Sequence, residues 1–122
     1  MTKSPAVPKA IRDAARGLLF PSETDAPVEA FAWPAGPVSA AGVLAHTGSA
    51  TGTKVEEVTL TDILRGVPSA LRGNFFDLLL ALVDHLSGVK VFKVGAVRKT
   101  IYVVGTTAEG FRAGVKTEAV ET

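Results

Sequence analysis

The chain has 122 residues, a length that fits one domain, and it contains no cysteine, which excludes disulfides and thiolate metal sites. Thirteen basic and twelve acidic residues nearly cancel, whereas a nucleic-acid-binding domain usually has a clear basic excess. The longest apolar stretch, residues 75–86, is too short and too charged to span a bilayer. The amino terminus lacks the apolar core of a secretory signal. We therefore expect a cytoplasmic protein that forms a single domain over residues 1–122 and binds neither nucleic acid nor membranes.

The first third of the chain predicts a helix, a loop and a strand. Residues 9–19 place apolar side chains on one face and basic side chains on the other, which is typical of a short helix. Two prolines and several small polar residues predict a loop over residues 20–27. Residues 28–33 then alternate as a strand, and Pro34 ends it.

A second helix and a second strand follow. Pro37 suits the first position of a helix that runs to about His46 and ends at Gly48. Residues 54–60 have the pattern of a strand. Thr61 is a suitable cap for the helical turn that comes next.

Residues 74–87 give the clearest helical pattern in the chain. Apolar residues nearly encircle this helix and leave only a thin polar stripe through Asn74, Asp77 and Asp84. Such a helix is usually buried on most sides. Gly88 is expected to end it.

The last third of the chain predicts β structure. The pattern predicts a hairpin of residues 89–94 and 98–104 about Gly95, and residues 111–120 alternate cleanly. Short connections between consecutive strands favour antiparallel pairing. The fold class we expect is α/β, as a three-layer α/β/α sandwich on a mostly antiparallel sheet.

Catalytic and phosphate-binding motifs are not found. The glycine-containing segment 48–54 superficially suggests a phosphate-binding loop, but its spacing differs from that motif and no helix is predicted after its lysine. His46 and His85 have no companion at a metal-ligand spacing. We therefore expect no catalytic residue, no cofactor and no enzymatic activity.

Three charged segments allow both a functional and an ordinary interpretation. The basic hairpin between Lys90 and Lys99 could contact phosphates, although lysines also protect an exposed sheet edge from strand addition. Glu23 lies in the proline-braced loop, and Glu121 and Thr122 close the chain just after a strand. Loops are often acidic and termini often fray, so these acidic features alone do not define a site.

Two stretches resemble the nuclease A inhibitor family, whose founding member inhibits a sugar-non-specific nuclease. The first is GLLFPSETDAPVEAFAW (residues 17–33). The second is VFKVGAVRKTIYVVGTTAEGFRAGVKTEAVET (residues 91–122), which is similar to the closing segment of the family. Both stretches and the helix between them follow the family order, so the resemblance covers nearly the whole chain. It implies an α/β/α sandwich in a bacterial, cytoplasmic inhibitor that binds a secreted metal-dependent nuclease of the ββα-metal type.

The resemblance also implies which residues bind the nuclease. Glu23, with Thr24 beside it, would enter the nuclease active site and stand in for the scissile phosphate. Thr122, preceded by Glu121, would place its hydroxyl on the Mg²⁺ of the partner nuclease. Mg²⁺ prefers hard oxygen ligands, and a carboxylate gains charge-assisted hydrogen bonds in a cationic phosphate site.

A second function class stays open at this point. The chain could be a diverged protein-interaction or regulatory module that uses the same fold without inhibiting a nuclease. The oligomeric state is not indicated by the sequence.

Overall fold

The computed structural model describes residues 7–20, 26–48, 53–65, 67, 69–96 and 98–120. Seven strands lie in this part of the chain: β1 (Leu19–Phe20), β2 (Ala26–Pro27), β3 (Glu29–Trp33), β4 (Val55–Val58), β5 (Ser87–Val94), β6 (Arg98–Thr106) and β7 (Arg112–Val120). Five of them form one sheet in the order β3-β7-β6-β5-β4, and every neighbouring pair in it is antiparallel. β1 and β2 form a separate two-stranded ladder.

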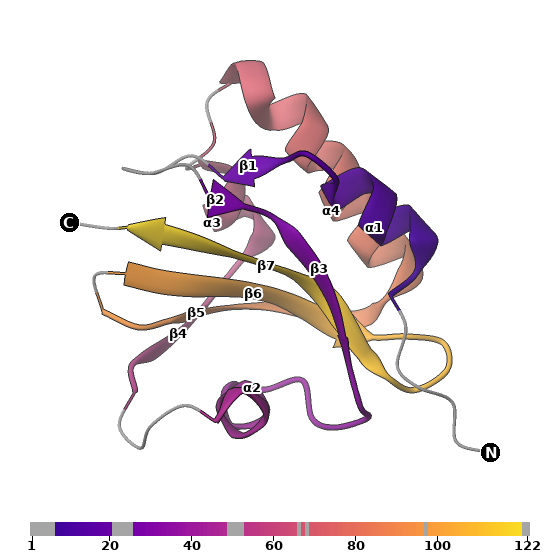
Figure 1. Cartoon of the computed structure of the whole chain (residues 1–122), viewed down its shortest axis with the longest axis vertical. Coiled ribbons are helices and arrows are strands. Elements are labelled where there is room, and N and C mark those ends of the chain that lie inside the picture. The colour runs from indigo at the N-terminus through magenta and orange to yellow at the C-terminus, as the bar shows by residue number, and fades with distance from the viewer. Residues whose placement is uncertain are drawn as a thin grey trace.

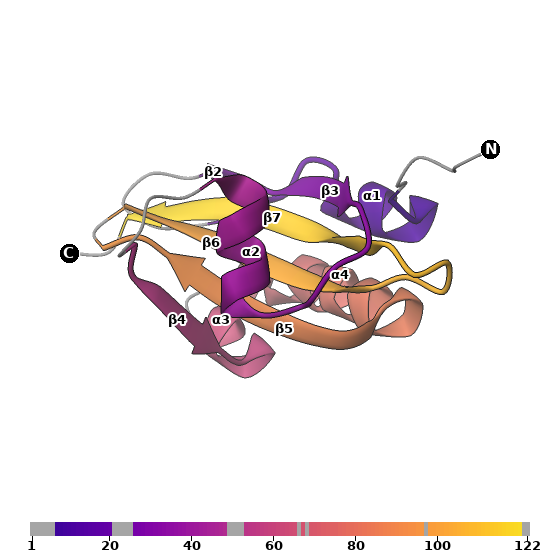
Figure 2. The ribbon, with the colours of Figure 1, turned by 90° about the horizontal axis from the view of Figure 1, so that it is seen from below.

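Helices lie against both faces of the sheet. The described helices are α1 (Lys9–Ala15), α2 (Ala40–Thr47), α3 (Leu60–Arg65), a single 3-10 turn η1 (Ser69–Leu71) and α4 (Arg72–His85). Figure 1 shows α1 and α4 on one face and α2 on the other, and Figure 2 shows α2 lying across the strands. The mixed α/β class and the antiparallel sheet are confirmed. The three-layer sandwich stays a prediction, because one eight-residue helix covers only part of the second face.

The larger core lies between the sheet and the helices α1, α3 and α4. Ile11 of α1 and Leu82 of α4 are fully buried there, against strand residues such as Val91 and Ile101. Phe20 of β1 packs edge-on against Phe75 of α4, with ring centres 6.0 Å apart. The β1–β2 ladder is therefore fixed to the same core as the long helix.

A smaller core lies beneath α2 on the opposite face. Its buried members are Phe31, Trp33, Val43, Phe92, Val94 and Val104. Phe31 and Trp33 stack with centres 4.3 Å apart, and Val43 is the fully buried residue that α2 contributes. Aromatic rings therefore provide much of the apolar surface on this side.

The starts of two helices differ from the sequence expectation. α2 begins at Ala40 and not at Pro37, because the Ser39 hydroxyl accepts a hydrogen bond of 3.0 Å from the Gly42 amide. Its end at Gly48 is as predicted, with a positive φ of 67°. α1 is shorter than predicted and ends at Ala15, before the left-handed Gly17.

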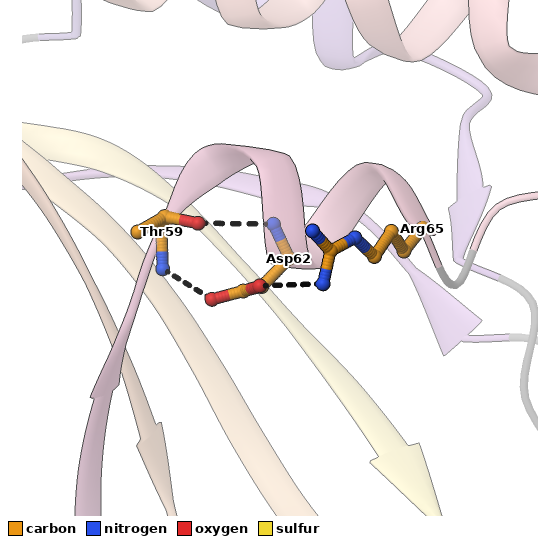
Figure 3. A network of polar contacts seen from close by, with 3 residues as sticks. All are labelled: Thr59, Asp62 and Arg65. Atoms are coloured by element: carbon orange, nitrogen blue, oxygen red, sulfur yellow. Dashed lines mark hydrogen bonds and ion pairs between the residues drawn. The ribbon is translucent and has the colours of Figure 1, made fainter.

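The helix α3 is capped by Thr59 and not by Thr61. The Asp62 amide donates to the Thr59 hydroxyl at 3.1 Å, and the Thr59 amide donates back to the Asp62 carboxylate at 3.1 Å (Figure 3). This reciprocal pair is a capping box with aspartate in the place of glutamate. Arg65 adds an exposed ion pair to Asp62 at 3.5 Å.

The long helix α4 is less buried than its sequence predicts. It spans residues 72–85, so Ser87 and Gly88 already belong to β5. Phe76, Leu80 and Val83 are about half exposed, at 53%, 44% and 45%. The expectation of a helix buried on most sides is wrong, because α4 packs only one face against the sheet and α1.

Candidate partner-binding end of the sheet

The four predicted partner-binding residues lie outside the described residues. Glu23 and Thr24 belong to the segment between Phe20 and Ala26, whereas Glu121 and Thr122 follow β7. The elements that carry these two segments can nevertheless be located. The β1–β2 ladder and the carboxyl end of β7 lie on the same side of the molecule, at the left of Figure 1.

The side chain of Thr117 links these two elements. The Thr117 hydroxyl on β7 lies 3.1 Å from the Pro27 carbonyl oxygen and 3.4 Å from that of Ala26, and it donates toward them. Phe20 pairs with Ala26 across the ladder. Both ends of the segment that holds Glu23 are therefore fastened beside the strand that leads to Thr122.

A hollow of about 470 Å³ opens next to this junction. Three neighbouring strands form its floor, where Glu29, Lys116 and Tyr102 lie side by side in register. The ladder forms one wall through Pro27, and Glu118 and Thr100 extend the floor toward the end of β7. The hollow thus lies on the part of the second sheet face beside α2.

The charges around the hollow are mixed. Lys116 and Glu29 form an ion pair at 3.9 Å, and both side chains are exposed, so the pair contributes little to stability. Burial raises the pKa of Tyr102 above its ordinary value, and the negative charge of Glu118 raises it further. Tyr102 therefore keeps its proton at neutral pH and can donate a hydrogen bond from the floor.

The aromatic core under α2 supports this floor. The Tyr102 ring packs edge-on against Phe31 at 6.2 Å and lies 5.7 Å from Trp33. Trp33 in turn stacks on His46, with ring centres 4.3 Å apart. His46 therefore sits at the end of α2, as expected, and its described contact is aromatic packing.

Arg112 is a structural residue that the sequence analysis did not identify. It is only 6% exposed, and its guanidinium lies 5.3 Å from the centre of the Trp33 ring. It donates to the carbonyl oxygens of Pro34 at 2.9 Å and Gly42 at 3.3 Å. Its position in the strand alternation places it on the same face as Lys116. The segment that leads into α2 then covers it, which no local pattern indicates.

The described residues offer little for catalysis. The His85 ring nitrogen Nδ1 lies 3.0 Å from the Ala81 carbonyl oxygen of its own helix, on the exposed side. No group of three or more histidine or acidic side chains that could hold a metal ion occurs within the described ranges. Among the helices in those ranges, none is long and apolar enough to cross a membrane. The junction presents hydrogen-bonding and charged groups.

A comparison with known families identifies the kind of protein. The sequence profile of the family described as nuclease A inhibitor-like protein matches residues 6–122. The chain belongs to this family. The match spans both the β1–β2 ladder and β7, so the resemblance of the two sequence stretches is confirmed as family membership. None of the curated proteins compared with the chain matches it.

Family membership indicates the general function of the chain. The family description is that of a nuclease inhibitor, which implies that the chain binds a nuclease.

Proposed function

We propose that the chain inhibits a sugar-non-specific, metal-dependent endonuclease of the ββα-metal type by occupying its active site. Glu23 and Thr24 enter the catalytic cleft, and Glu121 and Thr122 approach from the end of β7. Glu23 replaces the scissile phosphate, and the Thr122 hydroxyl coordinates the Mg²⁺ of the nuclease. The chain itself supplies no metal and no catalysis.

The Thr117 tether is the observation that supports this proposal. Two segments far apart in the sequence can act on one active site only if the fold brings their ends together. Thr117 does so by holding the base of the 21–25 segment against β7 at 3.1 and 3.4 Å. Preorganisation of this kind lowers the entropy that binding must overcome.

The chemistry of the two segments suits the active site of such a nuclease. A carboxylate in a site built for phosphate accepts charge-assisted hydrogen bonds from cationic side chains. Mg²⁺ takes oxygen ligands and usually keeps several exchangeable waters, one of which a hydroxyl can replace. A nuclease with its cleft filled in this way cannot bind nucleic acid.

The first experiment separates charge from shape at Glu23. We expect Glu23→Gln to weaken binding to a purified ββα-metal nuclease by about 2 kcal/mol, as loss of a buried interface hot spot does. Glu109→Gln is the matched control, because Glu109 lies in the β6–β7 turn at the opposite end of the sheet. The measurement is the inhibition constant on DNA substrate. Unchanged inhibition by Glu23→Gln would rule out phosphate mimicry.

The second experiment tests the metal contact of Thr122. Thr122→Val keeps the shape of the side chain and removes its hydroxyl, so we expect weaker inhibition and a changed dependence on Mg²⁺ concentration. Deleting Thr122 should weaken inhibition as well. Thr107→Val, in the β6–β7 turn, is a control for the loss of a threonine hydroxyl elsewhere. Identical Mg²⁺ dependence in the parent and Thr122→Val would exclude the metal bridge.

A further inference from the structure

A groove of about 630 Å³ runs between α1 and the edge strand β3, on the sheet face opposite the hollow beside α2. Its lining includes Arg12 of α1, Arg16 just after that helix, Val28 just before β3, and Ala30 and Ala32 of β3. β3 is a terminal strand of the sheet, since it pairs with β7 on one side only. Figures 1 and 2 both show α1 beside this edge.

The outer edge of β3 carries backbone groups that no described residue pairs. The Val28 amide points outward, since it donates to the Leu18 carbonyl oxygen at 3.0 Å. Backbone groups alternate in direction along a strand, so those of Ala30 and Ala32 point outward as well. On the amino-terminal side of Leu18, however, the chain folds into α1 and no longer forms a strand beside β3. Among the described residues, nothing continues the line of β1 next to Ala30 and Ala32.

Two arginines give the groove its charge. Arg12 lies in α1 and Arg16 follows the last residue of that helix, and both residues line the groove. Arg16 pairs with Asp13 at 3.5 Å, but both side chains are exposed, at 77% and 46%, and such a pair exchanges easily. The small side chains of Ala30 and Ala32 leave room between the arginines and the strand.

We propose that this groove binds an extended acidic segment of another protein, which adds a strand to β3 while its carboxylates pair with Arg12 and Arg16. Main-chain hydrogen bonds to Ala30 and Ala32 hold the segment in register, as in other cases of strand addition. The arginines select acidic side chains on the face toward α1. Pro34 limits the added strand to a short one, since it ends β3.

The charges disfavour two other occupants. A second copy of the chain, paired edge to edge through β3, would bring the arginines of both α1 helices toward each other across the symmetry axis. Residues 1–6 of the same chain contain Lys3, which the arginines repel, and Pro5, which has no amide to donate. An acidic segment from another protein meets neither obstacle.

The test uses nuclear magnetic resonance on the full ¹⁵N-labelled chain, without any nuclease. The probe is a capped peptide of alternating valine and glutamate, and the control peptide carries lysine at the glutamate positions. We expect the glutamate peptide to shift the amide signals of Ala30 and Ala32 and to slow their hydrogen exchange. The lysine peptide should leave both amides unchanged. No shift at these amides with the glutamate peptide at millimolar concentration would overturn the proposal.

Variants of the chain test the two parts of the site separately. The double variant Arg12→Gln with Arg16→Gln should weaken peptide binding about fivefold or more, as expected for two exposed ion pairs. Lys9→Gln, on the same helix, is the control for lost charge and should bind like the parent. Ala32→Pro removes one outward amide, which an edge strand tolerates, and should also weaken binding. Equal affinity of the parent and the double arginine variant would overturn the charge selection.

The other occupants give distinct results in the same spectra. Signals of Ala30 and Ala32 that move with protein concentration in the absence of peptide would assign the edge to a second copy. Slow exchange of these amides that becomes fast when residues 1–6 are deleted would assign it to the chain itself. Either result overturns the proposal. None of these outcomes bears on nuclease inhibition, which the inhibition assays test independently.

Discussion

The face of the sheet beneath α1, α3 and α4 buries a broad layer of aliphatic side chains, whereas α2 is the described helix that covers part of the opposite face. On the first face, stability comes from the burial of residues such as Leu82, which has no exposed surface. On the second face, a stack of aromatic rings and the buried Arg112 hold the short helix in place. The helices on the two faces are thus held to the sheet by different interactions, mainly aliphatic burial on the first face and aromatic stacking with a buried arginine on the second.

The difference shows how a small domain can leave part of its sheet free for a partner. The remaining floor around Tyr102 and Lys116 stays open, next to the ladder and the end of β7. The proposed nuclease-binding end therefore lies where the second face is uncovered, while the first face supplies most of the apolar burial.

The largest effect is expected on the apolar face. Leu82→Ala should lower the free energy of unfolding by about 2–5 kcal/mol, because the fully buried side chain leaves a cavity in the core. Leu80→Ala is the matched control on the same helix, since Leu80 is 44% exposed. Denaturant unfolding measures both variants. Equal losses for Leu80→Ala and Leu82→Ala would contradict the one-sided packing of α4.

A smaller loss is expected when the hydrogen bonds of Arg112 are removed. Arg112→Met keeps the length of the side chain and removes its hydrogen bonds, leaving the Pro34 and Gly42 carbonyl oxygens without this partner. We expect a loss of about 1–3 kcal/mol, the cost of buried polar groups that lose their hydrogen bonds. Trp33 is the only tryptophan in the chain, so its fluorescence reports on the same site directly. Unchanged stability and fluorescence would show that aromatic packing alone holds α2.

The tether between the ladder and β7 should give a modest effect on stability and a larger one on inhibition. Thr117→Val keeps the shape and removes one donor, so we expect a loss of about 0.5–1.5 kcal/mol in the free energy of unfolding. Thr117→Ser keeps the hydroxyl and is the control. If the tether orients Glu23, Thr117→Val should also weaken nuclease inhibition while the chain remains folded. Full inhibition by Thr117→Val would remove this positioning role.

The sequence predicted the elements better than it predicted their environment. The clean alternation of residues 111–120 correctly predicted the strand β7, because period-two patterns are local. The burial of Arg112 on that strand could not be predicted in the same way, because it depends on the distant segment that leads into α2. Likewise, the apolar residues around α4 predicted a helix buried on most sides, yet Phe76 is exposed. The burial of such a residue depends on how many elements pack around the helix.

For the candidate site, too, the sequence indicated the residues but not the contacts between distant parts of the chain. A resemblance to known inhibitors pointed to Glu23 and Thr122, and family membership is confirmed, but the roles of these residues stay predictions. That their two segments end side by side depends on Thr117 and the ladder, which join positions about ninety residues apart. No local pattern encodes such a contact. It appears only when the strands have been paired.

The smallest effects concern the capping box of α3, whose hydrogen bonds are exposed (Figure 3). Hydrogen bonds to Thr59 lower the pKa of the Asp62 carboxyl below its ordinary value of 3.8, and the bond to the Thr59 amide has a larger effect than the bond to its side chain. The positive charge of Arg65 lowers this pKa further. A lowered native pKa means that the folded state binds the proton more weakly than the unfolded state does. The stabilisation is therefore complete above the unfolded pKa and is lost as the pH falls through the native one.

Two variants separate the cap from the charge. Thr59→Ala should cost about 1 kcal/mol at neutral pH, the usual value for a lost helix cap. Asp62→Asn keeps the shape and removes the charge, so it should be less stable than the parent at neutral pH. That difference should shrink as the pH falls through the native pKa of Asp62, because the parent then loses its charge as well. Denaturant unfolding of both proteins over a series of acidic pH values measures this convergence. A difference that stays constant into strong acid would mean that Asp62 acts through its shape and hydrogen bonds and not through its charge.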